Sequence, residues 1–360
     1  MTDRKIYISA QRKSTKEEGS LERRMCIRME TFTRKDVQEL KKQIEPIKKL
    51  ALHDDADGIT SAVLMSYACK IYKVWAPDDF GEWPITPYKV QGQQEYELPP
   101  DVCVDMVPAN SDWVGFCFDH HPGHPPEEKR KYKLVYADVP ASLIIYTVFK
   151  DFIPQEQRWK VVVGAVGDGQ PELVPTEIWR EFPVLLEECI SSWEKYGKVE
   201  TVSYPLYMRL SSGINAACKL PEKWYVAYSV LRNAKSPWDL INDPSLKAAK
   251  DFLEEERSKI YSETNPIQLR NGIRIWPFAS ETKIERTLAW ELWEKDKKTT
   301  IAINTQTGRG SIRGTLATLI YEHLSANGFK ASGHPGFGGL KLKSGQTWED
   351  VYKCLTTLKI

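Results

Sequence analysis

The sequence has neither a long hydrophobic run nor a strong excess of charge. No stretch of about 18 apolar residues, the length that crosses a membrane, occurs in its 360 residues. The N-terminal segment "MTDRKIYISAQRKSTKEEGS" also lacks the apolar core of a secretory signal. Basic and acidic side chains number 50 and 49, so the net charge is +1 and any nucleic-acid contact has to come from a local patch. These absences predict a cytoplasmic protein without membrane contacts.

Cysteine pairs at metal-binding spacing are missing as well. The seven cysteines are scattered along the chain, and none forms a Cys-x-x-Cys pair. Neither a thiolate zinc site nor a disulfide framework is therefore indicated. We expect buried free thiols.

Length and composition fit two globular domains of ordinary size. Hydrophobic residues make up 41% and charged residues 28%, as in soluble domains, and 360 residues exceed what one small core organises. Residues 1–35 contain ten Lys or Arg against five acids and predict a basic arm. The patterns further predict a first domain over 36–200, connecting helices over 201–261 and a smaller α/β domain over 262–360.

Short apolar runs alternate with helical patterns in the first domain. "TRKDVQELKKQI" has helical spacing, "LAL" predicts a strand that stops at an acidic cluster, and "GITSAVLMSYACKIYKVW" predicts a buried helix. "VCV" and "FCF" predict further strands, whereas "ASLIIYTVF" and "RWKVVVGAVGDG" predict helices. This order predicts an α/β fold with a mostly parallel sheet, whose ligand site lies beyond the carboxyl ends of the strands.

The second half of the chain has a different pattern. Residues 175–260 have helical periodicity and no chemical motif that we can name. From residue 262 the pattern predicts a strand around Ile273 and Ile275, a helix rich in Trp and Glu, and a strand at "TTIAIN". "GRGSIRGTLATLIYEHL" and a glycine-rich "SGHPGFGG" follow. We expect a second α/β domain, with a cleft between the two domains.

Histidines and aspartates gather in a few short segments. Five of the six histidines lie among Asp, Gly or Pro residues rather than on helical faces: His53, His120, His121, His124 and His334. If "HDDADG" is extended, His53, Asp55 and Asp57 share one face and Asp54 points to the other. Three ligand-type side chains would then face one site.

Further ligand-type residues follow other apolar runs. Asp105 follows "VCV", the group Asp119, His120 and His121 follows or closes "FCFD", and Asp168 ends "VVVGAVGD". If these ends are neighbours, at least four carboxylates converge with two or three imidazoles, and they repel strongly unless cations neutralise them. Oxygen and imidazole ligands favour Mn²⁺, with Mg²⁺ as the alternative, and the set is large enough for two such cations. The alternative is a set of helix caps and turn aspartates that lie far apart.

These motifs resemble those of a known superfamily. "HDDADGITSA", "VDMV", "FDHH" and "GAVGD", in that order, resemble the DHH phosphoesterase superfamily. "GSIRGT" with "SGHPGFGG" resembles the DHH-associated C-terminal domain of its RecJ-like branch. The form of the first and last N-terminal motifs is most similar to archaeal RecJ-like nucleases.

The resemblance implies a role for each residue of these motifs. Asp55 and Asp105 would hold one metal ion, with His53 in place of a histidine that many relatives carry at the position of Ala51. The other ion would be held by Asp57, Asp105, His120 and Asp168, so that Asp105 bridges the two. His121 would contact the scissile phosphate or assist the leaving group, and Asp119 would orient its neighbours.

The C-terminal motifs imply a substrate site. By resemblance, nucleotide phosphates and bases would be bound there by Ser311, Arg313, Gly333, His334, Gly338 and Gly339, with Arg313 also stabilising charge during the reaction. Phe337 stands where relatives usually have a small residue and would either pack within its domain or stack on a base. His124 has no counterpart that we can assign, and we expect a turn residue near the site.

The implied function is a two-metal phosphodiesterase or exonuclease acting on single-stranded DNA or RNA oligonucleotides, with replication or repair proteins as further partners. A first alternative keeps the chemistry with a small substrate, such as a cyclic dinucleotide, a dinucleotide or a nucleoside bisphosphate; the near-neutral charge and the lack of room for an added OB-fold favour it. A second alternative is a non-catalytic scaffold in replication or repair.

Overall fold

The chain forms two compact units in the computed structural model. The first unit contains Met1–Cys218 and Glu222–Lys247, and the second contains Lys219–Pro221 and Ala248–Ile360. Most of the predicted connecting region over 201–261 thus packs with the first unit. The structure describes residues 34–76, 87–90, 93–96, 99–108, 111–195, 198–269 and 272–358, so the predicted basic arm lies almost wholly outside the described residues.

A five-stranded parallel sheet forms the centre of the first unit. Its spatial order is β2-β1-β5-β6-β7, and each neighbouring pair is parallel. Leu52 pairs with Val104, which in turn pairs with Phe118, so β1, β5 and β6 end at one edge of the sheet. This confirms the predicted parallel α/β fold. The strands are β1 (Ile47–Leu52), β2 (Ile71–Trp75), β5 (Val102–Val104), β6 (Phe116–Asp119) and β7 (Lys133–Tyr136).

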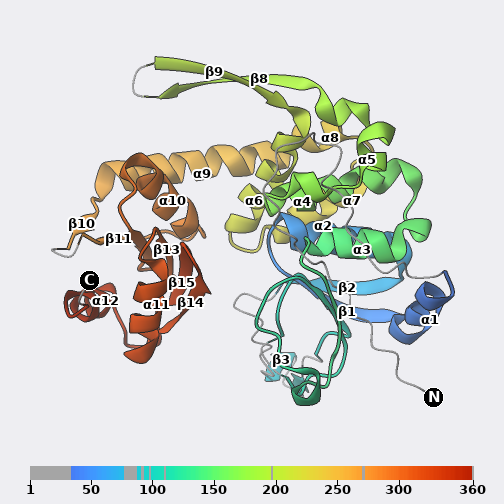
Figure 1. Ribbon diagram of the computed structural model, residues 1–360, viewed down its shortest axis with the longest axis horizontal. Helices are drawn as coiled ribbons and strands as arrows, with labels where there is room; N and C mark the ends of the chain where they lie inside the picture. Colours follow the sequence, from blue (N-terminus) through green and yellow to red (C-terminus); the bar gives the residue numbers. More distant parts are fainter. Residues whose placement is uncertain are drawn as a thin grey trace, which may run out of the picture. The chain divides into compact units, whose positions relative to one another are not determined.

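Three helices gather on one side of this sheet (Figure 1). They are α2 (Ala56–Ala68), α3 (Ala141–Phe149) and α4 (Val161–Gly167), and α2 packs against both of the others. Nearly every residue of α2 is buried, as its apolar sequence predicted. The prediction that this helix continues to Trp75 was wrong: it ends at Ala68, and the β-branched and aromatic residues of "IYKVW" form β2 instead.

Other apolar side chains form a second cluster in the first unit. Ala51, Cys103 and Cys117 of β1, β5 and β6 are fully buried there with Trp113 and Tyr132. Helix α1 (Arg34–Ile44) also buries its predicted apolar face. The cysteines that the structure describes are free, and most are buried, as expected.

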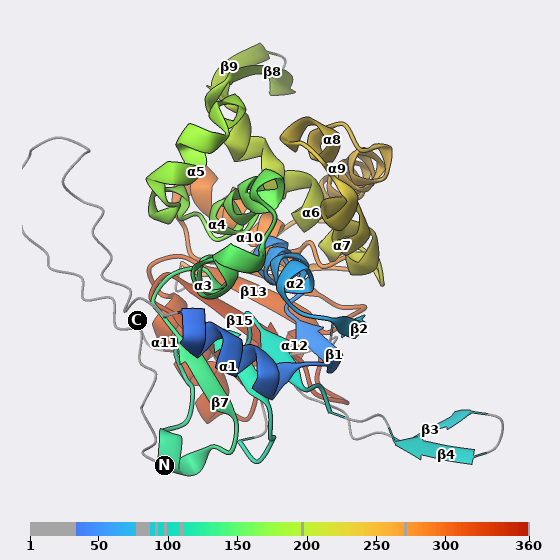
Figure 2. The ribbon, with the colours of Figure 1, turned by 90° about the vertical axis from the view of Figure 1, so that its right-hand side faces the viewer.

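The rest of the first unit is mostly helical, with one exception. The helices are α5 (Thr176–Glu181), α6 (Leu210–Lys219), α7 (Trp224–Asn233) and α8 (Pro237–Ile241), while α9 (Pro244–Glu263) continues into the second unit. The helical prediction for 175–260 was wrong over β8 (Glu188–Lys195) and β9 (Lys198–Pro205), which pair as an antiparallel hairpin. This hairpin projects from the helices (Figures 1 and 2). "CISSW" and "VETVSY" are rich in strand-forming residues.

Short elements complete the first unit. β3 (Pro87–Val90) and β4 (Gln93–Tyr96) form an antiparallel pair. Single 3₁₀ turns occur at Glu127–Lys129, Lys150–Phe152, Gln155–Lys160, Pro171–Leu173, Pro183–Leu186 and Leu206–Arg209. None of the helices in the described ranges is long and apolar enough to cross a membrane.

The second unit is a smaller α/β unit with a six-stranded mixed sheet, as predicted. Its order is β10-β11-β12-β13-β15-β14, in which only β11 and β12 are parallel neighbours. One apolar cluster joins this sheet to α11 and α12, and another joins it to α9 and α10. The elements are β10 (Ile267–Gln268), β11 (Arg274–Phe278), α10 (Glu285–Asp296), β12 (Thr300–Asn304), β13 (Arg309–Arg313), α11 (Ala317–Ala326), β14 (Lys330–His334), β15 (Phe337–Lys341) and α12 (Trp348–Thr356).

Truncating Leu64 in α2 tests the core of the first unit. Leu64 is fully buried, so we expect Leu64→Ala to lower the free energy of unfolding by about 2–5 kcal/mol through lost burial and a residual cavity. Leu186→Ala is the matched control, because Leu186 is 51% exposed and its truncation is expected to cost about 0.5 kcal/mol or less. Denaturant unfolding measures both. Equal losses in the two variants would contradict the described packing of α2.

Candidate metal centre

The ends of three neighbouring strands and of one helix bring the predicted ligands together. His53 and Asp55 follow β1, Asp105 follows β5, and His120 and His121 follow β6. Asp168 stands instead at the C-terminus of α4, where its backbone N–H donates to Gly164. Much of "RWKVVVGAVGDG" thus forms the helix that the sequence predicted, and Asp168 follows it. The packing of α4, and not the order of the strands, places the Asp168 carboxylate in the cluster.

Asp55 marks the transition from strand to helix. It is the N-cap of α2, and its Oδ1 accepts hydrogen bonds from the amides of Asp57 and Gly58 at 3.1 and 3.0 Å. Its Oδ2 lies 2.7 Å from His53 Nδ1. A Cβ at Gly58 would lie 2.1 Å from the carbonyl oxygen of His53, so this tight turn needs a glycine.

Asp57 reaches the site by a different route from the predicted one. The prediction that alternation along an extended segment places it beside His53 and Asp55 was wrong, because Asp57 already belongs to α2. Its side chain is fully buried and accepts hydrogen bonds from the amides of Ala141 and Ser142 at 2.6 and 3.0 Å. These amides belong to the first residues of α3. The Asp57 carboxylate therefore accepts hydrogen bonds from backbone N–H groups that have no partner within the helix, while it faces the cluster.

Two glycines of "GAVGD" make room for this arrangement. A Cβ at Gly164 would lie 2.3 Å from Ser142 Oγ and 2.5 Å from Asp57 Oδ1. A Cβ at Gly167 would lie 2.6 Å from the Cβ of Ala56. The motif therefore lets α4 approach the start of α2 closely, and Asp168 follows at the end of the same helix.

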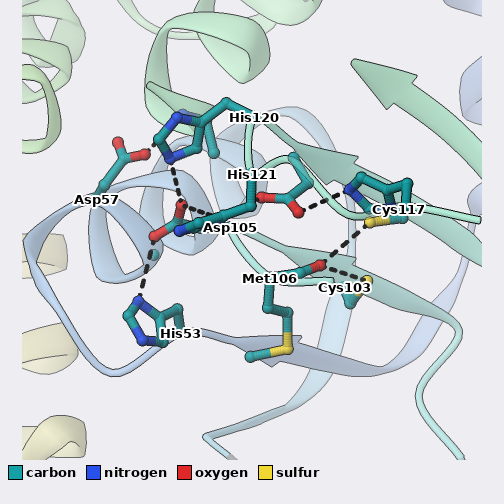
Figure 3. A network of polar contacts seen from close by, with 12 residues as sticks. His53, Asp57, Cys103, Asp105, Met106, Cys117, His120 and His121 are labelled. Carbon is teal, nitrogen blue, oxygen red and sulfur yellow. Dashed lines mark hydrogen bonds and ion pairs between the residues drawn. The ribbon is translucent and has the colours of Figure 1, made fainter. Parts of the chain in front are cut away.

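Asp105 lies at the centre of the cluster (Figure 3). Its backbone is left-handed, with φ of 60°, a conformation that Asp tolerates better than most residues. Its carboxylate is 1% exposed, with Oδ1 3.1 Å from His120 Nε2 and Oδ2 3.6 Å from His53 Nδ1. One carboxylate thus faces two histidines from different strand ends, the position expected of a bridging ligand.

The geometry fits metal ions better than hydrogen bonding alone. His120 Nε2 lies 3.1 Å from an oxygen of both Asp105 and Asp168, although one ring nitrogen can donate only one proton. His53 Nδ1, Asp105 Oδ2 and Asp168 Oδ2 are buried atoms that form no hydrogen bond of acceptable geometry, although ionisable neighbours lie 2.7–3.6 Å from them. Among the groups whose ligand atoms are close enough to hold an ion are His53 with Asp55 and Asp105, and Asp57 with His120 and Asp168. These are the donors that divalent Mn or Mg accepts.

Like charges dominate the electrostatics of the cluster. Burial and the neighbouring carboxylates raise the pKa of Asp168 to about 9. Burial, Asp55 and Asp57 also raise the pKa of Asp105 well above its usual range. For Asp55 burial acts in the same direction, but the charge of nearby His53 and the hydrogen bond from the Gly58 amide outweigh it and lower the pKa. A bound cation would remove the repulsion that holds protons on these acids.

Behind the cluster lies a network that the sequence did not predict. Asp119 Oδ1 lies 2.8 Å from His121 Nδ1, and Asp119 Oδ2 lies 2.8 Å from His124 Nε2. Against burial, the two imidazoles hold the pKa of Asp119 below its usual range. His124 lies near the site outside helices and strands, as expected, but its side chain is only 6% exposed and contacts Asp119, which the sequence did not predict. The sequence signal was the third histidine in "DHHPGH".

The second unit brings its own predicted residues together on three adjacent strands. Ser311 of β13 pairs with Gly339 of β15, and Gly338 of β15 pairs with Gly333 of β14, next to His334. A Cβ at Gly333 would lie 2.3 Å from the carbonyl oxygen of Phe337, so the close pairing of these strands requires a glycine there.

Arg313 is the cation of this surface. It is 6% exposed, donates from Nη1 to the carbonyl of Ile312, and lies over the Phe337 ring at 5.4 Å. Burial and nearby Arg286 lower its pKa to about 10, and we find no carboxylate paired with it in the part of the chain that the structure describes. Phe337 is 45% exposed, so it packs against Arg313 and still presents part of its ring to solvent.

Adding a methyl group at Gly164 tests the approach of α4 to Asp57. We expect Gly164→Ala to displace Asp57 or Ser142 and to weaken Mn²⁺ binding at least about tenfold, since misplaced ligand geometry typically costs that much. Gly213→Ala is the matched control, because an added methyl group in that helix would lie 3.0 Å from the Cβ of Leu246, which is not a predicted ligand. Calorimetric titration measures both affinities. Unchanged affinity in Gly164→Ala would contradict the described contact.

Metal binding is expected to release protons. Below pH 9 Asp168 keeps its proton in the metal-free folded protein, whereas a cation needs the ionised carboxylate. Mn²⁺ affinity is therefore expected to increase between about pH 6.5 and 8.5, by up to about tenfold per pH unit for one proton. Because the raised pKa means that the folded state binds more protons than the unfolded state, the metal-free protein loses stability over the same range. Titrations in buffers of different ionisation enthalpy count the protons; none released would refute this.

Several solved structures have a similar arrangement of elements. No protein-family profile and no curated protein matches the sequence. A crystal structure of exonuclease RecJ bound to manganese matches with a TM-score of 0.57 and 14% identity, over 89% of this chain and 91% of that one. RecJ from Thermus thermophilus with Mg²⁺ matches with a TM-score of 0.53 and 12% identity, over 89% of this chain. This chain spans only 50% of that protein.

A third match carries the DHH designation itself. The DHH domain of a member of a family of ribosomal proteins has a TM-score of 0.52 and 13% identity, over 91% of this chain and 90% of that one. Such low identities establish a common fold and nothing beyond it. The resemblance that the sequence motifs predicted is confirmed at that level: this chain has the fold of the RecJ-like DHH proteins.

Proposed function

We propose that this protein is a metal-dependent phosphoesterase that hydrolyses phosphodiester bonds of single-stranded DNA or RNA oligonucleotides. One observation carries the proposal: Asp105 faces both His53 and His120, and three buried ligand atoms of the cluster, His53 Nδ1, Asp105 Oδ2 and Asp168 Oδ2, form no hydrogen bond. Two cations side by side, which share a carboxylate, are the arrangement that phosphoryl-transfer enzymes use. The fold, found also in an exonuclease RecJ bound to manganese, supports the same reaction class.

The residues of the cluster would form two cation-binding sites. When bound, such cations supply the positive charge that polarises a phosphate and lowers the pKa of a water molecule. His53, Asp55 and Asp105 would hold one, and Asp57, Asp105, His120 and Asp168 the other. Mn²⁺ is our proposal for both, with Mg²⁺ as the alternative.

His121 is proposed to act on the substrate. Its side chain is 37% exposed, more than that of His120 or Asp105, so it borders the open side of the cluster. Its Nδ1 faces Asp119, which leaves Nε2 free to bind the scissile phosphate or to donate a proton to the leaving oxygen. Asp119 orients the ring and stabilises its positive charge.

The second unit is proposed to bind the rest of the substrate. Arg313 offers a largely desolvated guanidinium, and such a group binds phosphate strongly. Gly333, Gly338 and Gly339 are proposed to lie near the bound nucleotide, and Ser311 and His334 belong to the same three strands of the sheet. The net charge of +1 favours a short oligonucleotide over a long duplex, because broad phosphate binding needs many cationic groups.

Product analysis with end-labelled oligonucleotides tests the substrate class. Single-stranded DNA, single-stranded RNA and cyclic dinucleotides are each incubated with Mn²⁺, and the products are resolved by length. Stepwise shortening of the oligonucleotides supports the proposal and gives the polarity. Cleavage of the cyclic or dinucleotide substrates alone replaces it with the small-nucleotide alternative. If every substrate stays intact while bound metal is verified, the protein is a non-catalytic scaffold.

Replacing Asp168 separates catalysis from folding. Asp168→Asn keeps the side-chain shape but removes an anionic ligand, so we expect kcat to fall about a thousandfold, the rate equivalent of several kcal/mol. The metal-free variant is expected to be at least as stable as the wild type at pH 8, because ionisation of the buried carboxyl is unfavourable there. Asp112→Asn is the control, since Asp112 is 73% exposed in a surface ion pair. Full activity in Asp168→Asn would remove Asp168 from the site.

A further inference from the structure

Four polar groups form a continuous chain behind the candidate metal centre. Tyr132 Oη lies 2.9 Å from His124 Nδ1, and His124 Nε2 lies 2.8 Å from Asp119 Oδ2. The other oxygen of Asp119 lies 2.8 Å from His121 Nδ1. Tyr132 and Asp119 are almost fully buried, and His124 is 6% exposed. Of the four side chains, that of His121 is the most exposed, and it stands at the end of the network that borders the site.

The partners determine which atoms carry hydrogens. The Tyr132 hydroxyl donates to His124 Nδ1, so the ring hydrogen of His124 stands on Nε2 and points to Asp119. Each oxygen of Asp119 then accepts one ring N–H, and the carboxylate cannot rotate without losing one of the two. The His124 ring is also held by edge-on contacts with the rings of Tyr132 and Tyr136.

A third metal ion is the competing explanation for this network. Cys117, Asp119 and His124 offer ligand atoms close enough to hold one. However, both ring nitrogens of His124 and both oxygens of Asp119 already have partners at 2.8–2.9 Å. The Cys117 thiol contacts the carbonyl of Met106 at 3.4 Å (Figure 3). A closed set of hydrogen bonds therefore accounts for these atoms without a cation.

We infer that His124, itself held by Tyr132, is a positioning residue of the active site: it locks the Asp119 carboxylate so that Asp119 holds His121 by Nδ1 and leaves Nε2 for the substrate. The inference rests on the proposed function, because His121 is the residue proposed to act there. It assigns the histidine five residues after Asp119 to the catalytic apparatus without placing it in contact with substrate or metal.

Two substitutions of His124 distinguish positioning from packing. His124→Leu fills a similar volume but donates nothing to Asp119, and we expect kcat to fall about 10- to 100-fold with KM and Mn²⁺ affinity within about twofold of wild type. His124→Gln carries an amide N–H near the position of Nε2, and we expect it to restore most of kcat. His323→Gln is the matched control, because His323 contacts Cys354 and Thr357 of the second unit. Equal activity in the Leu and Gln variants would overturn the inference.

A magnetic-resonance measurement tests the same point without any substrate. In Mg²⁺-loaded protein with ¹⁵N-labelled histidine, the proton on His121 Nδ1 is expected as a slowly exchanging downfield resonance. It is expected to persist in His124→Gln and to broaden or vanish in His124→Leu. Persistence in the folded Leu variant would overturn the inference. Because this readout needs no turnover, it decides the matter even if the wild type cleaves no phosphodiester and the proposed function fails.

Tyr132→Phe is a second variant that tests the same inference if His124→Leu does not fold. This change removes one hydroxyl from a buried ring and leaves the His124 ring in place. We expect a decrease in kcat of about threefold to tenfold with unchanged KM, together with faster exchange of the His121 Nδ1 proton. Wild-type values for both quantities would contradict the role assigned to Tyr132 and His124.

Discussion

Repulsion among buried carboxylates is the constraint around which the first unit is organised. Asp55, Asp57, Asp105 and Asp168 converge around His53 and His120, and burial together with the neighbouring carboxylates raises the pKa values of Asp57, Asp105 and Asp168. A fold selected for stability alone would separate such groups or pair them with lysine or arginine. Their convergence at the end of a parallel sheet is explained by a ligand of opposite charge, and cations with oxygen and imidazole ligands supply it.

Backbone features hold these carboxylates in place before any cation binds. Asp55 caps α2, Asp57 accepts two amides at the start of α3, and Asp105 has a left-handed backbone. Gly164 removes the Cβ that would separate α4 from Asp57. Each ligand therefore has a second structural task, which limits its freedom to move away from its neighbours. His121 is restrained in a similar way by the hydrogen bonds that connect it through Asp119 to His124 and Tyr132.

The second unit contains a buried positive charge. Arg313 is buried against Phe337 without a carboxylate partner in the described ranges, so its charge is available to an anion. Gly333 on β14 lets this strand pair closely with β15. Each unit by itself thus offers a place for positive charge that an anion could meet: the proposed cations in the first and the Arg313 guanidinium in the second.

The linear sequence determined most classes of element, with β2 and the β8–β9 hairpin as exceptions, and the identities of the clustered residues. The order of apolar runs predicted a parallel sheet, and acidic motifs after "LAL", "VCV" and "FCF" predicted convergence, because parallel strands end at one edge. Tertiary structure decided how Asp57 and Asp168 reach the cluster, since helix packing rather than strand alternation places them. It also decided the role of His124, because a hydrogen bond to Asp119 depends on how a loop folds back, which local periodicity does not encode.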